Sequence, residues 1–242
     1  MTQNLKLKRQ YYVGLDLAKK QDFSAVAVVE QCVWTTGKKD PLTFAPLLER
    51  NTVLRHIEQI KSGTTYMRVV EHVRKMLVSE QLRDETVIFS MDATGAGEGV
   101  MEMVEAMLVQ ARRERTGVLN FAGVVFTAGG KTTWHQYEAR VPKNTIVEGV
   151  LLAVERGELI LGKDMPGVKE LVAELQMMQQ ERSERGTRWV SAGKHDDLVM
   201  ALGLALWGTT YREVPRNWRE LGWGRPSWEW EAMRREEEME KK

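Results

Sequence analysis

Apolar and polar residues alternate along two neighbouring segments near the start of the chain. In residues 11–17, Val13 and Leu15 fall on one face of an extended backbone, while Asp16 falls on the other. A second apolar run, residues 23–30, follows a short polar turn. Two such runs joined by a short turn are typical of a β-hairpin.

The next stretch is harder to interpret from its pattern. Residues 35–50 carry Gly37, Pro41 and Pro46, which interrupt regular structure, so we expect a loop there. Residues 51–60 fit either a strand or a short helix, and we favour a strand.

The remaining pattern switches repeatedly between strand-like and helix-like spacing. A short apolar run predicts a strand, and apolar residues three or four positions apart predict a helix. We expect strands at 85–92, 120–126, 158–161 and 188–190. We expect helices at 65–82, 99–113, 142–156, 167–181 and 194–207.

This order of elements indicates an α/β fold. Several strands in succession, followed by strands that alternate with helices, fit one central mixed β-sheet with helices on both faces. The helix at 194–207 is apolar nearly all round and should be buried. We assign residues 1–210 to this domain and residues 211–242, rich in Trp and then charged, to a C-terminal tail.

The composition bears on the cellular location of the protein and on its binding partners. Among 242 residues, Cys32 is the only cysteine, so no internal disulfide can form and a cytoplasmic location is expected. No apolar segment approaches the roughly 20 residues of a membrane span, so no membrane association is expected. The net charge of +1 lacks the basic excess of many nucleic-acid binders, although charge can still be segregated between faces.

Four aspartates stand out, and each has an ordinary explanation by itself. Asp16 could face solvent at the end of its strand, and Asp92 could be a turn residue before TGAG. Asp196 and Asp197 could stabilise the first turn of their helix through its dipole, by roughly 0.3–1 kcal/mol each.

Together the four acids suggest a metal centre. Carboxylate oxygens are the ligands that Mg²⁺ and Mn²⁺ prefer, and converging carboxylates without a cation would repel one another. Two such ions about 3.5–4 Å apart can support phosphodiester hydrolysis. Spacing alone does not show that Asp16, Asp92 and the Asp196–Asp197 pair converge.

Three segments resemble one known family in order and context. They are GLDLAKKQDFSAVAVV at 14–29, SMDATGAGEGV at 90–100 and GKHDDLVMALGLAL at 193–206. They resemble the signature segments of the nuclease domain of viral terminase large subunits, which has the RNase H-like fold and is related to RuvC-type resolvases. The stretch PKNTIVEGVLLAVERGELIL at 142–161 resembles the same family.

The resemblance implies a function and a set of site residues. Asp16, Asp92, Asp196 and Asp197 match the family's acids, which bind two Mg²⁺ or Mn²⁺ ions and cut double-stranded DNA during genome packaging. Asp196 ranks ahead of Asp197, and His195 is a further candidate to orient a ligand or contact phosphate. Partners implied by the resemblance are a separate packaging ATPase, a small terminase subunit or a portal, in the host cytoplasm.

One departure limits the resemblance. Full-length terminase large subunits carry an ATPase motor, but no G-x-x-x-x-G-K-[ST] motif occurs in this chain. Gly130, Lys131 and Thr132 match its end, whereas Val125 stands at the first glycine position. We therefore interpret the chain as a nuclease part without its motor.

Basic residues near these segments are candidates for phosphate contacts. The candidates are Lys131, Lys143 and Lys194, each of which could equally be a solvated surface residue. Three alternative functions remain open. They are a resolvase-like nuclease acting on branched DNA, a non-catalytic DNA- or capsid-binding module of the same fold, and an actin-like ATPase.

Overall fold

Strands and helices alternate through most of the chain. The computed structural model describes residues 8–18, 23–44, 46–135, 138–183, 186–193 and 195–210. The strands are β1 (Lys8–Asp16), β2 (Ser24–Lys39), β3 (Pro46–Ile60), β4 (Val87–Asp92), β5 (Leu119–Thr127), β6 (Thr133–His135), β7 (Glu138–Pro142), β8 (Leu159–Ile160), β9 (Met178–Ser183) and β10 (Gly186–Ser191). The helices are α1 (Tyr66–Leu77), α2 (Glu98–Glu114), α3 (Lys143–Glu155), α4 (Val168–Gln176) and α5 (Asp197–Thr210).

Eight of these strands form one mixed sheet in the order β6-β7-β5-β4-β1-β2-β3-β8. β1 pairs in parallel with β4, β4 with β5, and β5 with β7. β2 runs antiparallel between β1 and β3. The carboxyl ends of β1, β3, β4, β5 and β7 therefore lie along one side of the sheet, which we call the carboxyl edge.

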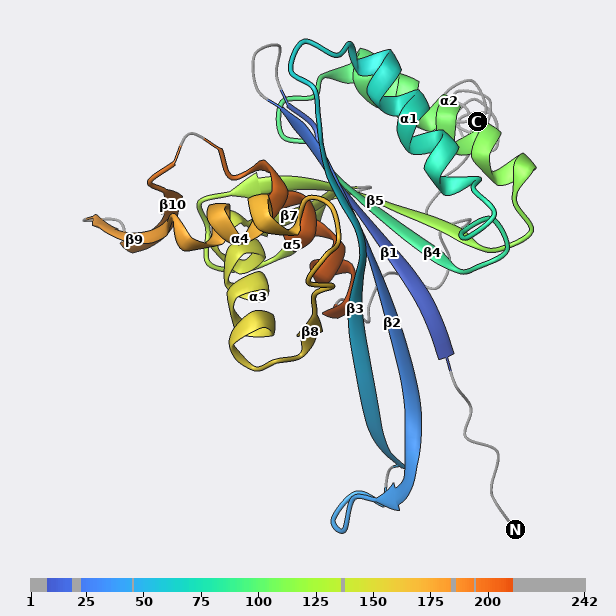
Figure 1. Ribbon diagram of the computed structural model, residues 1–242, viewed down its shortest axis with the longest axis vertical. Helices are drawn as coiled ribbons and strands as arrows, with labels where there is room; N and C mark the ends of the chain where they lie inside the picture. The colour runs from blue at the N-terminus through green and yellow to red at the C-terminus, as the bar shows by residue number, and fades with distance from the viewer. Residues whose placement is uncertain are drawn as a thin grey trace, which may run out of the picture.

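Both faces of the sheet are covered by helices, as Figure 1 shows. On one face, α1 and α2 pack over residues such as Val13, Leu15 and Phe89. On the other face, α3, α4 and α5 pack over residues such as Tyr12 and Ile88. The predicted α/β class is confirmed, with a central mixed sheet flanked by helices on both faces, consistent with an RNase H-like fold.

Helix α5 is the centre of the second core. All its side chains from Leu198 to Trp207 are buried, as its nearly continuous apolar sequence predicts. The helix lies directly on β1 at Gly14, where a Cβ atom would come 2.0 Å from the Ala201 carbonyl oxygen. Only a residue without a side chain allows the two backbones to approach this closely.

The predicted loop at 35–50 is largely wrong, because β2 continues to Lys39 and β3 begins at Pro46. Cross-strand contacts hold this extension together: the Trp34 indole N–H donates to Glu49 at 3.2 Å. The strand expected at 51–60 is confirmed as part of β3. We call residues 34–50, which project from the body in Figure 1, the arm.

Two other expectations need correction. The helix expected at 167–181 ends at Gln176, because residues 178–183 pair with residues 186–191 in a separate two-stranded ribbon. The short strands β6 and β7 were not expected, and β7 extends the main sheet by pairing with β5. Strands of three to five residues carry too few positions to show an alternating pattern.

The expected tail at 211–242 lies outside the described residues. Within the described ranges, none of the helices combines the length and the apolar character that crossing a membrane requires.

Candidate active site

Asp16 and Asp92 end two adjacent strands. β1 and β4 are parallel partners with Leu15 opposite Met91, so the two acids are the next positions along their strands. Leu15 and Met91 belong to the core under α1 and α2. The alternation of a strand therefore turns Asp16 and Asp92 toward the opposite face, where α5 lies.

The start of α5 brings the third acidic segment to the same place. Ala201 and Ala205 contact Gly14, and Gly208 lies against Tyr12. The helix thus runs in the direction opposite to β1 and begins at the carboxyl edge. Asp197, about one turn before Ala201, is placed beside the end of β1 that carries Asp16.

The four carboxylates lie close enough for their charges to influence one another. The pKa of Asp16 is raised well above its ordinary value, first by burial and then by the negative charges of Asp92, Asp197 and Asp196. The positive charge of Lys143 acts in the opposite direction. Asp197 raises the pKa of Asp16 more than Asp196 does.

Polar neighbours hold the Asp196–Asp197 pair. Lys143, at the start of α3, donates from Nζ to Asp196 Oδ2 at 2.8 Å. Gln59, near the end of β3, donates from Nε2 to Asp197 Oδ2 at 3.2 Å. His195 Nδ1 lies 3.4 Å from the same oxygen. Asp197 is buried and Asp196 is partly exposed, so the two neighbouring acids occupy different environments.

Asp92 also has a structural role in the turn that follows β4. Its Oδ1 accepts a hydrogen bond from the Thr94 backbone N–H at 2.7 Å. The Thr94 hydroxyl oxygen in turn accepts from the Phe126 N–H at 2.8 Å. Gly95 and Gly97 have φ angles of 69° and 76°, the left-handed region that favours glycine. The ordinary reading of Asp92 as a turn residue is thus correct, and it is compatible with a second role.

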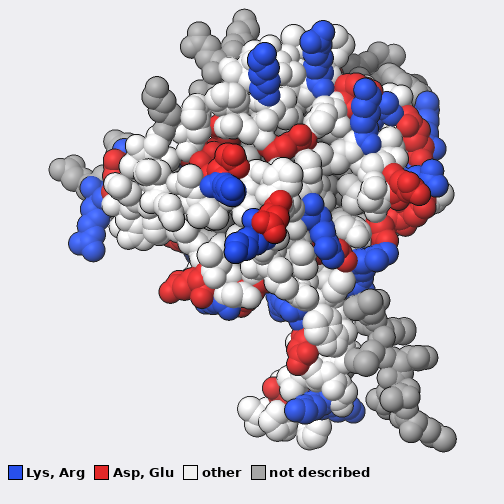
Figure 2. Space-filling view, in the orientation of Figure 1, with Lys and Arg blue, Asp and Glu red and all other residues white. Residues whose placement is uncertain are grey.

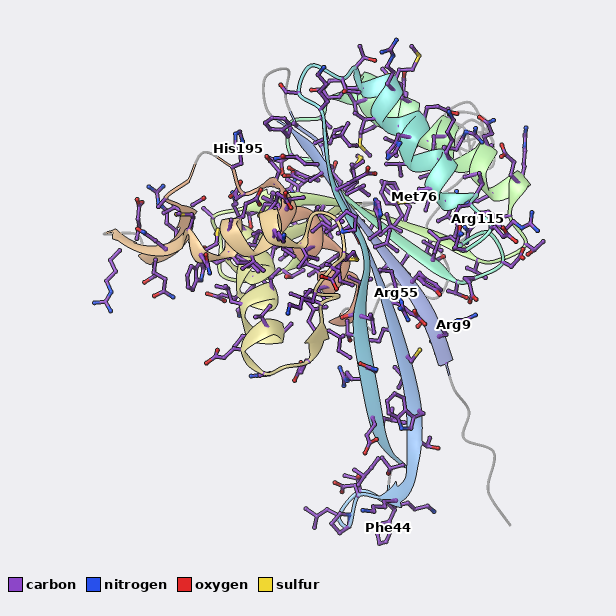
Figure 3. All side chains as sticks on the ribbon, in the orientation of Figure 1. Arg9, Phe44, Arg55, Met76, Arg115 and His195 are labelled. Carbon is purple, nitrogen blue, oxygen red and sulfur yellow. The ribbon has the colours of Figure 1, made fainter. Side chains whose placement is uncertain are left out.

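The lysines predicted to contact phosphate are not all at the acidic group. Lys143 contacts the acidic group, whereas Lys131 is exposed in the segment between β5 and β6. Lys194 lies outside the described residues. The His195 ring packs edge-on against Phe23, with 5.1 Å between ring centroids, and this contact orients the imidazole beside Asp197. Figure 3 labels His195, which lies near the carboxyl edge of the sheet.

Glu174 on α4 is a fifth carboxylate at the site, and sequence reasoning missed it. Its Oε2 accepts hydrogen bonds from the backbone N–H groups of Leu198 and Val199 at 3.0 and 3.2 Å, so it caps the start of α5. Burial, followed by the charges of Asp197 and Asp196, raises the pKa of Glu174 to about 7 despite these hydrogen bonds. Because Glu174 belongs to a different helix, the residues just before α5, where a cap is usually sought, give no sign of it.

The acids are engaged with protein groups in this arrangement. Within the described ranges, no three or more His, Cys, Asp or Glu side chains are arranged to hold a metal ion. Lys143 contacts a carboxylate oxygen of Asp196, and Gln59 contacts one of Asp197. The composition of the group, hard oxygen donors with mutual repulsion, still fits a hard divalent cation.

Comparisons with known proteins add little. Neither protein-family models nor curated proteins give a match to the chain. Among solved structures, one similarity is to the crystal structure of NurA bound to dAMP and manganese, at 14% identity and a TM-score of 0.17. It covers 85% of this chain and 53% of that one, so this chain spans about half the length of the other. A likeness of this size carries no argument about fold or function.

Proposed function

We propose that the protein is a divalent-metal-dependent endonuclease that hydrolyses phosphodiester bonds of double-stranded DNA by a two-metal-ion mechanism. The observation that carries the proposal is the meeting of three distant acidic segments at the carboxyl edge. Asp16, Asp92 and the Asp196–Asp197 pair lie on one face of the sheet, close enough that the other three raise the pKa of Asp16. Gathering carboxylates in this way costs free energy, and titratable groups with strongly perturbed pKa values are concentrated at functional sites.

The roles of the acids follow from their positions. Asp16 is central to the group, because the charges of the other three all act on it. Asp92 would hold a cation from the β4 side, and Asp197 would hold one from the α5 side. We favour Asp197 over Asp196 as the direct ligand, since it acts more strongly on Asp16 and is the more buried of the two.

When bound, Mg²⁺ or Mn²⁺ would supply activation of a water and neutralisation of charge on the scissile phosphate. The chain's own residues prepare the site for it. Lys143 orients Asp196 and offsets part of the negative charge, while Gln59 and His195 fix the carboxylate of Asp197. Glu174 holds the first turn of α5 in place.

The sequence resemblance supports the narrower proposal that this is a nuclease of the viral terminase type. Its substrate would then be double-stranded DNA, and its partners a packaging ATPase, a small terminase subunit or a portal. Figure 2 shows basic and acidic side chains interspersed on the face it presents. That mixture agrees with the near-neutral net charge of +1.

A plasmid-nicking assay tests the proposal. Supercoiled DNA should be nicked with Mg²⁺ or Mn²⁺ and left intact with EDTA. Asp16→Asn, Asp92→Asn and Asp197→Asn should each lower the nicking rate about 100-fold or more, because each removes a proposed ligand. Asp164→Asn, at an exposed position, is the matched control and should retain full activity.

Two results would refute the nuclease proposal. One is cutting that persists without metal, or full activity in Asp16→Asn. The other is a wild-type protein that binds DNA but does not cut it with either ion, which would support a non-catalytic DNA-binding module.

A further inference from the structure

The tip of the arm exposes a group of large apolar side chains. Leu42 is 88% exposed and Phe44 is 73% exposed, and the nearby Leu47 and Leu48 of β3 are also exposed. Figure 3 labels Phe44 at the far end of the arm, away from the body. Clustered apolar residues at the end of a projection are costly to leave in water and mark an interaction site.

The tip has a defined conformation. The Asp40 carboxylate accepts hydrogen bonds from the backbone N–H groups of Leu42 and Thr43, at 3.0 and 2.7 Å. The Phe44 N–H donates to the Asp40 carbonyl oxygen at 2.9 Å, which closes the turn. Phe44 has a φ of 55°, a left-handed conformation that costs a bulky residue of order 1–3 kcal/mol. A glycine or asparagine would close this turn with less strain, so Phe44 is not explained by the turn alone.

The strands of the arm have open edges. β1 pairs with β2 only as far as Val33, and β8 pairs with β3 only at Thr52 and Val53. Between these limits, the outer edges of residues 34–39 and 46–51 pair with no other strand among the described residues. Open edges of this kind readily pair with another chain.

A cleft on the body lies at the base of the arm. It has a volume of about 180 Å³ and a mixed lining, in which Ile146 and Leu152 of α3 and Leu206 and Trp207 of α5 lie beside polar and charged residues that include Thr52, Arg156 and Glu158. Arg50 of the arm borders it. An apolar cavity of about 150 Å³ holds a benzene molecule, so this cleft is large enough for a phenylalanine ring.

The tip cannot enter the cleft of its own chain. Paired strands fix the direction of the arm, with Trp34 opposite Glu49 and Lys39 opposite Pro46. The tip therefore points away from Arg50 and from the cleft. A second copy of the chain can supply the missing tip.

We propose that two copies of the chain associate through their arms, each placing Phe44 in the cleft at the base of the other's arm, with Leu42 packed beside it. In a two-fold arrangement of this kind, both tips are buried and both clefts are filled by the same contacts. It would also bring the open arm edges alongside each other. This association does not depend on the nuclease activity.

Sedimentation velocity on the full chain tests the association. Between about 1 and 100 µM, the wild type should shift from monomer to dimer. Phe44→Asp should raise the dimer dissociation constant at least about 30-fold, because it removes the aromatic ring that the cleft would hold. Aspartate tolerates the left-handed conformation, so the turn should survive. Met67→Asp, at a residue of α1 that is 70% exposed, should dimerise as the wild type does.

Disulfide capture tests the contact itself. In a Cys32→Ser background, mixing a Leu42→Cys protein with a Leu152→Cys protein should give a cross-linked pair under mild oxidation. Mixing Leu42→Cys with Met103→Cys should not, since Met103 lies on α2 across the sheet from the cleft.

Several outcomes would overturn the proposal. A wild type that stays monomeric throughout this range would do so, including the case in which residues 211–242 of the same chain fill the cleft. Dimerisation of Phe44→Asp at wild-type strength would also overturn it. So would a Phe44→Asp variant that loses DNA binding while the wild type remains monomeric, because the tip would then be a DNA contact.

Discussion

Gly14 of β1 and Ala201 of α5 are in direct backbone contact, and a Cβ atom at position 14 would lie 2.0 Å from the Ala201 carbonyl oxygen. This contact sets the distance between the strand that carries Asp16 and the helix that begins at Asp197. A glycine two residues before the acid thus decides whether the acidic group can form.

Replacing Gly14 by alanine should therefore damage both stability and activity. Neither backbone can move far within the core, so we expect Gly14→Ala to lower the free energy of unfolding by about 3 kcal/mol or more. Urea denaturation measures this, and nicking should fall in parallel. Gly149→Ala is the control: its added Cβ meets nothing within 4 Å in helix α3, and it should stabilise by about 0.5–1 kcal/mol. Equal effects of the two substitutions would contradict the packing argument.

Neutralising Asp16 should stabilise the metal-free protein. Because the pKa of Asp16 is raised in the folded state, its ionised form opposes folding at neutral pH, where the unfolded chain carries the charge freely. Asp16→Asn should raise the melting temperature by about 2–4 °C for each kcal/mol of repulsion removed. Mn²⁺ should raise the melting temperature of the wild type much more than that of the variant. A lower melting temperature for metal-free Asp16→Asn would be the opposite of this expectation.

Removing the cap on α5 should loosen the acidic pair. Glu174→Ala leaves the N–H groups of Leu198 and Val199 without their acceptor, which should cost about 0.5–2 kcal/mol of stability and reduce nicking. Glu174→Gln keeps a carbonyl acceptor and should recover most of the stability. Lys169→Ala, at an exposed position of the same helix, serves as the control in thermal unfolding and nicking assays. If alanine at 174 behaved like alanine at 169, the cap would have no importance.

The two lysines named from the sequence should differ in their effects. Lys143 contacts Asp196 and lowers the pKa of Asp16, so Lys143→Ala should reduce nicking by about 10-fold or more. Lys131 is exposed, and Lys131→Ala should stay within about twofold of the wild type. Nicking rates at several Mg²⁺ concentrations make the comparison, and a larger loss from Lys131→Ala would reverse our assignment.

A separate group on the other face of the sheet should govern stability in acid. Glu58 of β3 contacts His56, with 3.2 Å between Nε2 and Oε1, and also His72 of α1. The hydrogen bond with His56, aided by His72, lowers the pKa of Glu58 to about 2 although burial opposes it. A lowered carboxyl pKa contributes stability above the unfolded value near 4.5 and loses it as the pH falls toward 2.

Acid titration of stability tests this group. Glu58→Gln should be about 1–2 kcal/mol less stable than the wild type near pH 6, and the two should converge near pH 2. Urea denaturation at a series of pH values gives both curves. Parallel curves down to pH 2 would show that the ionised carboxyl of Glu58 contributes nothing.

The main sheet and its covering helices could be predicted because their residues alternate clearly between two environments. Val13 and Leu15 face one core while Tyr12 faces the other, and this is visible in the sequence. The arm was missed because Gly37 and Pro41 suggest a loop, whereas pairing of β2 with β3 overrides that local signal. Long-range pairing is not encoded in any short window of residues.

The site was predictable only in part for the same reason. The acids have recognisable positions at the ends of strands and at the start of a helix, so Asp16, Asp92 and the Asp196–Asp197 pair could be named, although the sequence ranked Asp196 ahead of Asp197. The groups that hold them could not be found in this way: Glu174 and Gln59 come from distant elements whose sequences give no sign of the contact. Such partners are fixed by tertiary packing alone.

The continuous burial of α5 has a consequence for the order of events during synthesis. The strands that carry the first two acids emerge from the ribosome long before the helix, whose residues end at Thr210. Until α5 has been synthesised, the face of β1 on which it packs is exposed, and Asp16 and Asp92 lack the acids at the start of α5. The nuclease activity that we propose should therefore appear abruptly and late, when the apolar helix α5 packs against the sheet. A chain still being synthesised should therefore lack the proposed activity until residues up to Thr210 have been made.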